Sequence, residues 1–249
     1  MSGNGTSESG QDRVDFGYRA VARDEKAGMV RRVFESVAPR YDLMNDLMSL
    51  GIHRVWKREF ARMLDPRPRR RLLDLAGGTG DIVRLWHGMG GGEAILSDVN
   101  PAMLEAGRAR TPAGVALLVA DAERVPLQDS CVDRVSIAFG LRNCTDKLAV
   151  LREARRVLRP GGRFLCLEFS RFQVAALAPL YDAWSFGVLP RLGAAVAGDR
   201  ESYQYLAESI RTFPDQGALA AMLKEAGFAR VAVRNLSGGI AAIHAGWRL

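Results

Sequence analysis

The chain has 249 residues, of which 48% are apolar, 25% charged and 8% aromatic. Such a length and composition allow one large domain or two small ones with a substantial core, and they exclude wholesale disorder, collagen-like repeats and short disulfide-stapled scaffolds. The formal charge of +7 suits an anionic partner, either nucleic acid or an acidic lipid surface, but it does not identify one.

The cysteines and the amino-terminal residues indicate the compartment. Cys131, Cys144 and Cys166 are odd in number and form no C-x-x-C pair, which argues against a disulfide framework and against a zinc ribbon. Residues 1–14 have neither the basic nor the apolar part of a secretory signal, and no apolar run reaches the ~18 residues that a membrane span requires. We therefore expect a cytoplasmic protein with a disordered tail at 1–14 and a single domain at 15–249.

The central and carboxyl-terminal parts of the chain alternate strands with helices. Apolar runs bounded by turn residues predict strands at 71–76, 93–98, 115–121, 132–140, 163–169, 231–236 and 240–249. Apolar spacing of helical period predicts helices at 82–89, 101–110, 147–158, where Pro160–Gly162 ends the helix, and 215–228. This order predicts an α/β fold with a doubly wound, mostly parallel, seven-stranded sheet whose last two strands supply an antiparallel edge.

Two segments lie outside this alternation. Residues 25–64 have the pattern of helices, and residues 171–213 form an insertion rich in alanine, leucine, tyrosine and tryptophan. We expect both to cover the carboxyl ends of the strands, where open α/β sheets bind their ligands, as an amino-terminal helical cap and a helical lid.

A glycine-rich turn follows the first strand of the predicted sheet. Gly78, Thr79 and Gly80 lie where small residues let the backbone approach a ligand and leave N–H groups free to bind it. A nicotinamide-binding G-x-G-x-x-G motif aligned on Gly78 and Gly80 needs a third glycine where the chain has Val83, and no G-K-[ST] follows for a phosphate loop. The turn therefore predicts a nucleotide-like ligand of another kind.

Acidic residues accompany three of the predicted strands. Asp74 lies on the first, Asp98 ends the second, and Asp121 ends the third and precedes Ala122. An acid after the second strand accepts hydrogen bonds from ribose hydroxyls, and Asp121 with the following backbone could hold an adenine, although Asp121 alone could equally be a helix N-cap. Three acids without a phosphate-binding lysine fit a ligand that carries adenosine and a positive charge, such as S-adenosylmethionine.

Longer strings carry a resemblance to a known family. The chain resembles the ubiquinone/menaquinone biosynthesis C-methyltransferase (UbiE) family from about Asp15 to Leu249, in LLDLAGGTGD, DVNPAML, ADAERVP and RVLRPGGRFLCLEFS, and most specifically in YDLMND, FGLRN and YLAESI. The resemblance implies a class I, Rossmann-like methyltransferase that uses S-adenosylmethionine to methylate a ring carbon of a polyprenyl quinol, either 2-polyprenyl-6-methoxy-1,4-benzoquinol or demethylmenaquinol or both.

The resemblance also implies roles for residues of the cofactor site. It implies a cofactor contact at Thr79, ribose binding by Asp98, adenine contacts at Asp121 and Ala122, and a further contact at Ala138. Many relatives have serine at this last position, so the alanine leaves only a backbone contact there. With these residues we group Asp74, Gly78 and Gly80 of the strand and turn.

Catalysis on a hydroquinol ring requires an ionised ring hydroxyl. An unperturbed phenol has a pKa near ~10, so a permanently charged donor is needed to stabilise the oxyanion, and Arg142 after the fourth strand is our candidate. Arginine is a poor base, so the proton must pass to another group or to a water. We expect Tyr41 and Asn45, with Asp42 and His53, to line the substrate pocket.

Other functions remain open at the level of sequence. The positive charge favours a methyltransferase acting on nucleic acid, although FGLRN stands where amino-methylating enzymes carry N/D-P-P-Y/F. A methyltransferase acting on another small aromatic substrate is also an alternative. A non-catalytic adaptor that keeps the fold is a further alternative. We expect no metal, because the three histidines do not stand at ligand spacing, and no nucleic acid. We expect instead transient contact of residues 174–198 with the inner face of the membrane, and partner proteins of quinone biosynthesis.

Overall fold

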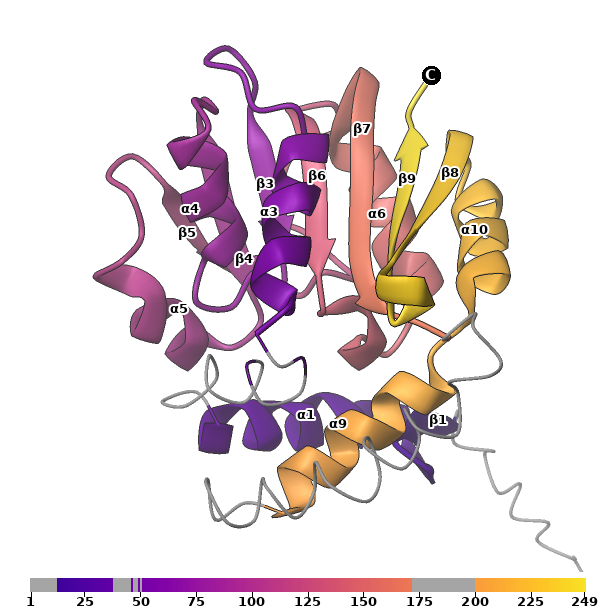
Figure 1. Cartoon of the computed structure of the whole chain (residues 1–249). Coiled ribbons are helices and arrows are strands. Elements are labelled where there is room, and N and C mark those ends of the chain that lie inside the picture. The colour runs from indigo at the N-terminus through magenta and orange to yellow at the C-terminus, as the bar shows by residue number, and fades with distance from the viewer. Residues whose placement is uncertain (1–12, 38–45, 47–48, 50, 172–199) are drawn as a thin grey trace, which may run out of the picture.

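The structure, a computed structural model, describes residues 13–37, 46, 49, 51–171 and 200–249. Seven strands form one sheet in the order β5-β4-β3-β6-β7-β9-β8 (Figure 1). In chain order they are β3 (Leu72–Leu75), β4 (Ala94–Asp98), β5 (Ala116–Val119), β6 (Val132–Ala138), β7 (Leu158–Phe169), β8 (Ala229–Leu236) and β9 (Ala241–Trp247). Neighbouring strands from β5 to β7 are parallel, whereas β9 runs antiparallel to β7 and β8.

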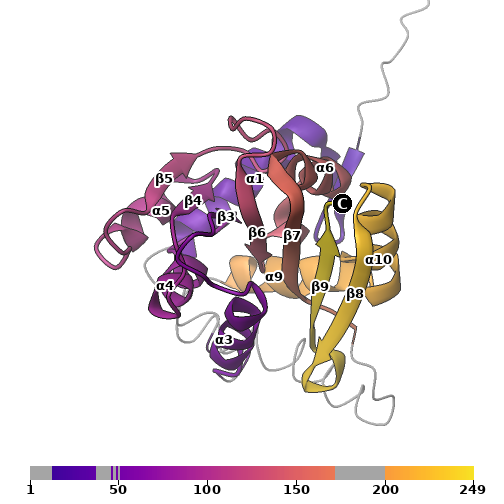
Figure 2. The same cartoon turned by 90° about the horizontal axis from the view of Figure 1, so that it is seen from above.

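Helices cover both faces of the sheet (Figure 2). They are α3 (His53–Met63), α4 (Asp81–Gly88), α5 (Pro101–Arg108), α6 (Lys147–Val157) and α10 (Gln216–Glu225). On one face Phe60 of α3 and Trp86 of α4 pack in a core with Leu165 of β7, and on the other Leu151 of α6 and Leu223 of α10 pack in a second core. All five side chains are fully buried, so each face of the sheet is covered, as parallel sheets require.

A third group of elements lies across the carboxyl ends of the parallel strands. It contains the antiparallel hairpin of β1 (Arg13–Phe16) and β2 (Arg19–Ala22), the helix α1 (Arg23–Val37) and the helix α9 (Arg200–Thr212). Figure 1 shows α1 and α9 side by side below the sheet, and the rings of Phe16 and Tyr205 stack 4.2 Å apart. Segments far apart in the chain therefore form one cap, which we call the cap below.

The predicted fold class is confirmed, including the antiparallel pair at the carboxyl terminus. One difference concerns β7, which begins at Leu158 and includes the Pro160–Gly162 segment that we expected only to end the helix. Leu158 pairs with Val132 and Arg163 with Arg134, and the shift of register between these pairs accommodates the additional residues.

The amino-terminal region also differs from the expectation. Strand β1 includes Arg13 and Val14, which we had placed in the tail, because the turn at Gly17 lets residues 13–22 close as a hairpin. Of the two helices described in the expected amino-terminal cap, α1 lies across the strand ends, whereas the buried side of α3 packs on a face of the sheet. The expected lid is described only in its carboxyl-terminal part, as α9, and residues 172–199 lie outside the described residues.

Candidate active site

The glycine-rich turn joins β3 to α4 and is tightly packed. Gly78 and Gly80 have φ angles of 55° and 84°, a region that favours glycine. A Cβ on Gly77 would lie 2.4 Å from a Leu96 methyl group and 2.6 Å from Oδ2 of Asp74, so no side chain fits there. Even Ala76 has a positive φ of 46°. The turn is thus built to bring backbone close to whatever lies at the end of the sheet.

Asp98 is fixed against this turn. Its two carboxylate oxygens accept hydrogen bonds from the backbone N–H groups of Gly78 and Asn100, each at 2.9 Å. Burial raises the pKa of Asp98, whereas the hydrogen bonds from these N–H groups tend to lower it. Each oxygen keeps a further lone pair, so the carboxylate can accept hydrogen bonds from a ligand hydroxyl without moving.

A pocket opens beside Asp98 at the carboxyl ends of β3 to β6. Residues from strand ends, connecting loops and α1 line it: Val30, Ala76, Asp98, Val99, Asn100, Met103, Ala120, Asp121, Ala122, Glu123, Phe139, Gly140, Asn143, Cys144 and Thr145. Asp121 is exposed and accepts from the N–H of Glu123 at 2.9 Å, while Ala122 is buried. The pocket therefore brings together three predicted cofactor residues, Asp98, Asp121 and Ala122.

The other predicted cofactor residues lie around the pocket rather than in its lining. Gly78, Thr79 and Gly80 belong to the turn, and Ala138 is the half-buried last residue of β6. Asp74 is fully buried below the turn, where it accepts a hydrogen bond from Ser136 at 2.6 Å. Burial, together with nearby negative charges, raises the pKa of Asp74 to about 7. The buried position of Asp74 indicates that this residue supports the turn and does not contact a ligand directly.

The lining suits an adenosine-containing cofactor. Carboxylates at Asp98 and Asp121 are acceptors for ribose hydroxyls and for an exocyclic amine, and Val99 and Met103 offer apolar surface to a flat base. The side-chain nitrogen of Asn100 is buried without a hydrogen-bond partner among the described residues, so it is a donor available to a ligand. The residues present thus fit the group that the sequence predicts.

Arg142 lies in the short helix η2 (Leu141–Asn143), directly after β6, but does not line the pocket. Its side chain is 1% exposed and donates from Nη1 to Oε2 of Glu168 at 2.8 Å. The guanidinium also lies 5.5 Å from the ring centre of Phe169 and 6.0 Å from that of Phe139. Its Nε is buried and has no hydrogen-bond partner among the described residues. Glu168 therefore balances the charge of Arg142, and the Nε–H of Arg142 is without a partner among the described residues.

The cap closes onto this end of the sheet through polar contacts. Lys26 of α1 is buried and donates to the carbonyl oxygen of Cys144 at 3.1 Å, and burial lowers its pKa to about 8. Tyr205 of α9 donates from its hydroxyl to Oδ1 of the pocket residue Asn143 at 3.2 Å. Sequence reasoning missed Lys26, Asn143, Glu168 and Tyr205. Glu168 had a signal, as an acid at the carboxyl end of a buried strand, and Asn143 and Tyr205 stand in the strings FGLRN and YLAESI that carry the resemblance.

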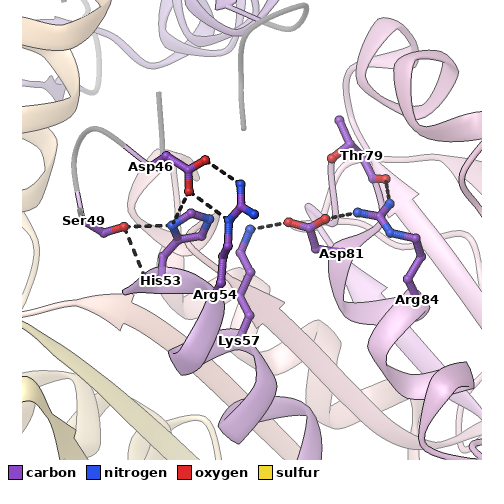
Figure 3. A network of polar contacts seen from close by, with 8 residues as sticks. All are labelled: Asp46, Ser49, His53, Arg54, Lys57, Thr79, Asp81 and Arg84. Carbon is purple, nitrogen blue, oxygen red and sulfur yellow. Dashed lines mark hydrogen bonds and ion pairs between the residues drawn. The ribbon is translucent and has the colours of Figure 1, made fainter. Parts of the chain in front are cut away.

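A second polar network lies where α3 meets the start of α4 (Figure 3). Lys57 donates to Oδ2 of Asp81 at 2.5 Å, and Arg84 pairs with the other carboxylate oxygen and donates to the carbonyl oxygen of Thr79 at 2.7 Å. These contacts brace the glycine-rich turn from the side of α3.

His53 belongs to the same region. Its Nδ1 is hydrogen-bonded to the hydroxyl of Ser49 at 2.8 Å, and burial with the nearby charge of Lys57 lowers its pKa to about 4. The imidazole is therefore neutral near pH 7. The predicted pocket residues Tyr41, Asp42 and Asn45 lie outside the described residues.

Metal ligands and membrane spans were sought within the described ranges. No cluster of three or more histidine, cysteine, aspartate or glutamate side chains that could hold a metal ion is present there. Likewise, none of the helices in these ranges has both the length and the apolarity to cross a membrane.

Comparison with solved structures concerns the fold. A methyltransferase from Thermotoga maritima, described as S-adenosylmethionine-dependent, matches 88% of this chain and 100% of its own with a TM-score of 0.65 at 19% identity. Phosphoethanolamine N-methyltransferase 2 of Haemonchus contortus, solved in complex with S-adenosylmethionine, matches 78% of this chain and 52% of its own with a TM-score of 0.57 at 14% identity. The chain therefore has the fold of the class I methyltransferases.

Comparison of sequences gives the family. The protein named ubiquinone/menaquinone biosynthesis C-methyltransferase UbiE in Acidiphilium cryptum is 66% identical over 98% of this chain and 100% of its own length. The protein of the same name in Methylobacterium nodulans is 54% identical over 95% of this chain and 97% of its own. The family model described as the ubiE/COQ5 methyltransferase family matches residues 19–248. The chain belongs to the ubiE/COQ5 methyltransferase family.

Proposed function

We propose that the protein catalyses S-adenosylmethionine-dependent C-methylation of a polyprenyl quinol ring in ubiquinone or menaquinone biosynthesis. The observation that carries this proposal is the 66% identity, over the full length of the relative, to a protein named for that reaction. The pocket supports it, because its carboxylates suit an adenosine-containing cofactor, as does the Asn100 side-chain nitrogen, which has no partner among the described residues.

When bound, the cofactor supplies a methyl group on a positively charged sulfonium. Asp98 holds the ribose hydroxyls, since its carboxylate is already oriented by Gly78 and Asn100, and Asp121 with Ala122 holds the adenine. Phe139 and Gly140 form the wall of the pocket on the side of η2 and the cap. These residues place the cofactor, and the substrate ring must then be aligned with it at about 3–3.5 Å.

Arg142 acts on the substrate side of this arrangement. The ring hydroxyl must lose its proton before the neighbouring carbon becomes nucleophilic, and the guanidinium stabilises the resulting negative charge. Its Nε–H, which has no partner among the described residues, is a donor suited to this purpose, whereas Nη1 is held by Glu168. Glu168 therefore has a positioning role, fixing the plane of the guanidinium against the rings of Phe139 and Phe169.

The proton must be accepted elsewhere. Arg142 cannot accept it, and His53 is a weak base because its pKa is lowered to about 4 and its Nδ1 is engaged by Ser49. Tyr41 and Asn45 are our proposed members of the substrate pocket, where they would orient the quinol or a water that accepts the proton.

The decisive experiment offers the purified protein methyl-labelled S-adenosylmethionine with a short-chain benzoquinol, a short-chain demethylmenaquinol, or RNA. Label on the ring carbon of either quinol supports the proposal and defines the headgroup. Label on RNA, or on no acceptor while S-adenosylmethionine still binds, contradicts it. Mass spectrometry of quinones in cells that lack the protein gives an independent result, since the unmethylated precursor should accumulate.

We further propose that the protein works in the cytoplasm at the surface of the membrane that holds its substrate, among proteins of quinone biosynthesis. The support is the polyprenyl tail of the proposed substrate and the formal charge of +7, which attracts acidic headgroups at up to ~1 kcal/mol for each basic side chain near the surface. The expected contact segment, 174–198, lies outside the described residues.

Flotation with vesicles of acidic lipid tests this location. We expect co-flotation at low salt that weakens at high salt, because charge attraction is screened over about 8–10 Å near physiological ionic strength. Vesicles of neutral lipid are the matched control. Absence of co-flotation at low salt, with quinol in the vesicles, would contradict surface binding and leave the methyltransferase assignment intact.

A further inference from the structure

Among the described residues that line the pocket, one has an aromatic side chain, namely Phe139. Phe139 directly follows β6, whereas Asp98 ends β4 and Asp121 follows β5. In the order of the sheet, β3 separates β6 from β4 and β5. Phe139 therefore lies away from the carboxylates that hold the adenosine in our proposal, on the side of the pocket that we assign to the substrate.

The backbone holds Phe139 in an unusual conformation. Its φ is 58°, a region that bulky residues rarely adopt. The N–H of Phe139 donates to the carbonyl oxygen of Leu167 at 2.8 Å, and a Cβ on Gly140 would lie 2.7 Å from the Cβ of Ala76, so contacts on both sides fix this turn. Such strain persists where the surroundings enforce it, and it gathers at ligand sites. Glycine would adopt this φ without strain, so the turn alone does not explain the aromatic side chain.

The ring of Phe139 also lies beside the cation that we assign to the substrate. The guanidinium of Arg142 is 6.0 Å from the centre of this ring, and the ring of Phe169 is 4.8 Å away and tilted by 40°. Phe139 is only 2% exposed to solvent and still lines the pocket. A flat ligand lying against it would be removed from water, and in such a place the charge of Arg142 acts more strongly than in solution.

We propose that the quinol ring stacks on the ring of Phe139 and that this contact sets which headgroup the protein prefers. The inference rests on the proposed function, which supplies the quinol. Aromatic rings attract one another in offset-stacked and edge-to-face arrangements, and a ring held in this way beside Arg142 has its hydroxyl close to the guanidinium. A naphthoquinol has a second fused ring, so it gains more contact area from stacking than a benzoquinol does.

Steady-state kinetics of Phe139→Leu test the inference. Leucine keeps an apolar side chain without a branch at Cβ but loses the flat ring. We expect the KM for a short-chain benzoquinol to rise about two- to tenfold, the effect of losing one aromatic pair, and the KM for a short-chain demethylmenaquinol to rise more. The affinity for S-adenosylmethionine, measured by calorimetry, should not change. Phe139→Tyr keeps the ring and should have both KM values near those of the wild type.

Phe164→Leu is the matched control. Phe164 is fully buried and its ring stacks on that of Phe228 in the core on the other face of the sheet, so it matches Phe139 in burial but not in its place at the pocket. Phe164→Leu should lower the melting temperature and leave both KM values unchanged. Should Phe139→Leu not fold, Phe139→Met gives the same test, because methionine adapts to irregular gaps.

The outcomes separate this inference from the proposed function. Unchanged KM values in Phe139→Leu, or a rise matched by an equal loss of affinity for S-adenosylmethionine, would overturn the stacking of the quinol on Phe139. An equal rise for the two quinols would overturn the role of Phe139 in headgroup preference. For a wild type that methylates one quinol only, the KM for that quinol decides. A wild type that methylates neither quinol would overturn the proposed function itself.

Discussion

The two sides of the candidate active site are built in different ways. On the cofactor side, at the ends of β3, β4 and β5, Asp98 is held by backbone N–H groups of its own neighbourhood and of the adjacent turn. On the substrate side, at η2 and the cap, side chains from remote segments meet in pairs: Arg142 with Glu168, and Asn143 with Tyr205. Backbone hydrogen bonds thus position the residues of the cofactor side, whereas contacts between paired side chains position those of the substrate side.

This difference has a consequence for substitutions. A site built by backbone groups depends on the glycines that shape the turn and on the group that contacts the ligand, and other side chains there can be replaced with less effect. A site built of side-chain pairs is sensitive at both members of each pair, because removal of one member leaves the other buried without a partner. Variants of the two sides should therefore separate cofactor binding from turnover.

The largest effect is expected from Arg142→Lys. Lysine keeps the charge but loses the planar fork that pairs with Glu168 and leaves Nε for the substrate. We expect turnover to fall by about two orders of magnitude, as on loss of an oxyanion donor, while the affinity for S-adenosylmethionine stays nearly unchanged. Steady-state kinetics and calorimetry measure the two quantities.

Two further variants make this result specific. Arg159→Lys changes an exposed arginine that pairs with Asp133 at the opposite end of the sheet, so it should leave both quantities unchanged. Glu168→Gln should lower turnover less than Arg142→Lys if Glu168 only positions the guanidinium. Equal losses of turnover and cofactor affinity in Arg142→Lys would contradict its assignment to the substrate side.

The second effect concerns the cofactor side. Asp98→Ala removes the charge-assisted hydrogen bonds to the ribose, each of roughly 1.5–3 kcal/mol, so affinity for S-adenosylmethionine should fall at least tenfold. Asp129→Ala, an exposed aspartate paired with Arg156, is the matched control. Unchanged cofactor affinity in a folded Asp98→Ala protein would refute the ribose assignment.

The same contrast explains what the sequence could predict. The glycine-rich turn and Asp98 belong to one unit of strand, helix and strand, β3-α4-β4, so their spacing along the chain is enough to place them in space. A mostly parallel, seven-stranded sheet with an antiparallel edge follows from the alternation of apolar runs and from the connections between them. These parts of the prediction are confirmed.

Contacts between remote segments could not be predicted in this way. Lys26 lies 118 positions from Cys144, and Tyr205 lies 62 positions from Asn143, so no local pattern brings them together. The hairpin at 13–22 was missed because each of its strands has four residues and is partly exposed. Arg142 could be singled out by its place after β6, but its partnership with Glu168 depends on the neighbouring strand.

The smallest effect is expected where the cap meets the pocket. The Tyr205 hydroxyl is the link between α9 and Asn143, and burial raises its pKa, so it stays neutral and acts as a donor. Tyr205→Phe removes this hydrogen bond but keeps the ring that stacks on Phe16. A net hydrogen bond of about 0.5–1.5 kcal/mol corresponds to roughly twofold to tenfold.

We expect Tyr205→Phe to lower kcat/KM for the quinol by this factor, because Asn143 would no longer be held in one orientation. The affinity for S-adenosylmethionine should not change. Tyr18→Phe is the matched control, since Tyr18 belongs to the turn of the hairpin and its side chain is exposed. A lowered melting temperature with unchanged kcat/KM would show that Tyr205 serves only the stability of the cap. A loss confined to kcat/KM would show that the cap, although assembled from segments far apart in the chain, takes part in positioning the substrate.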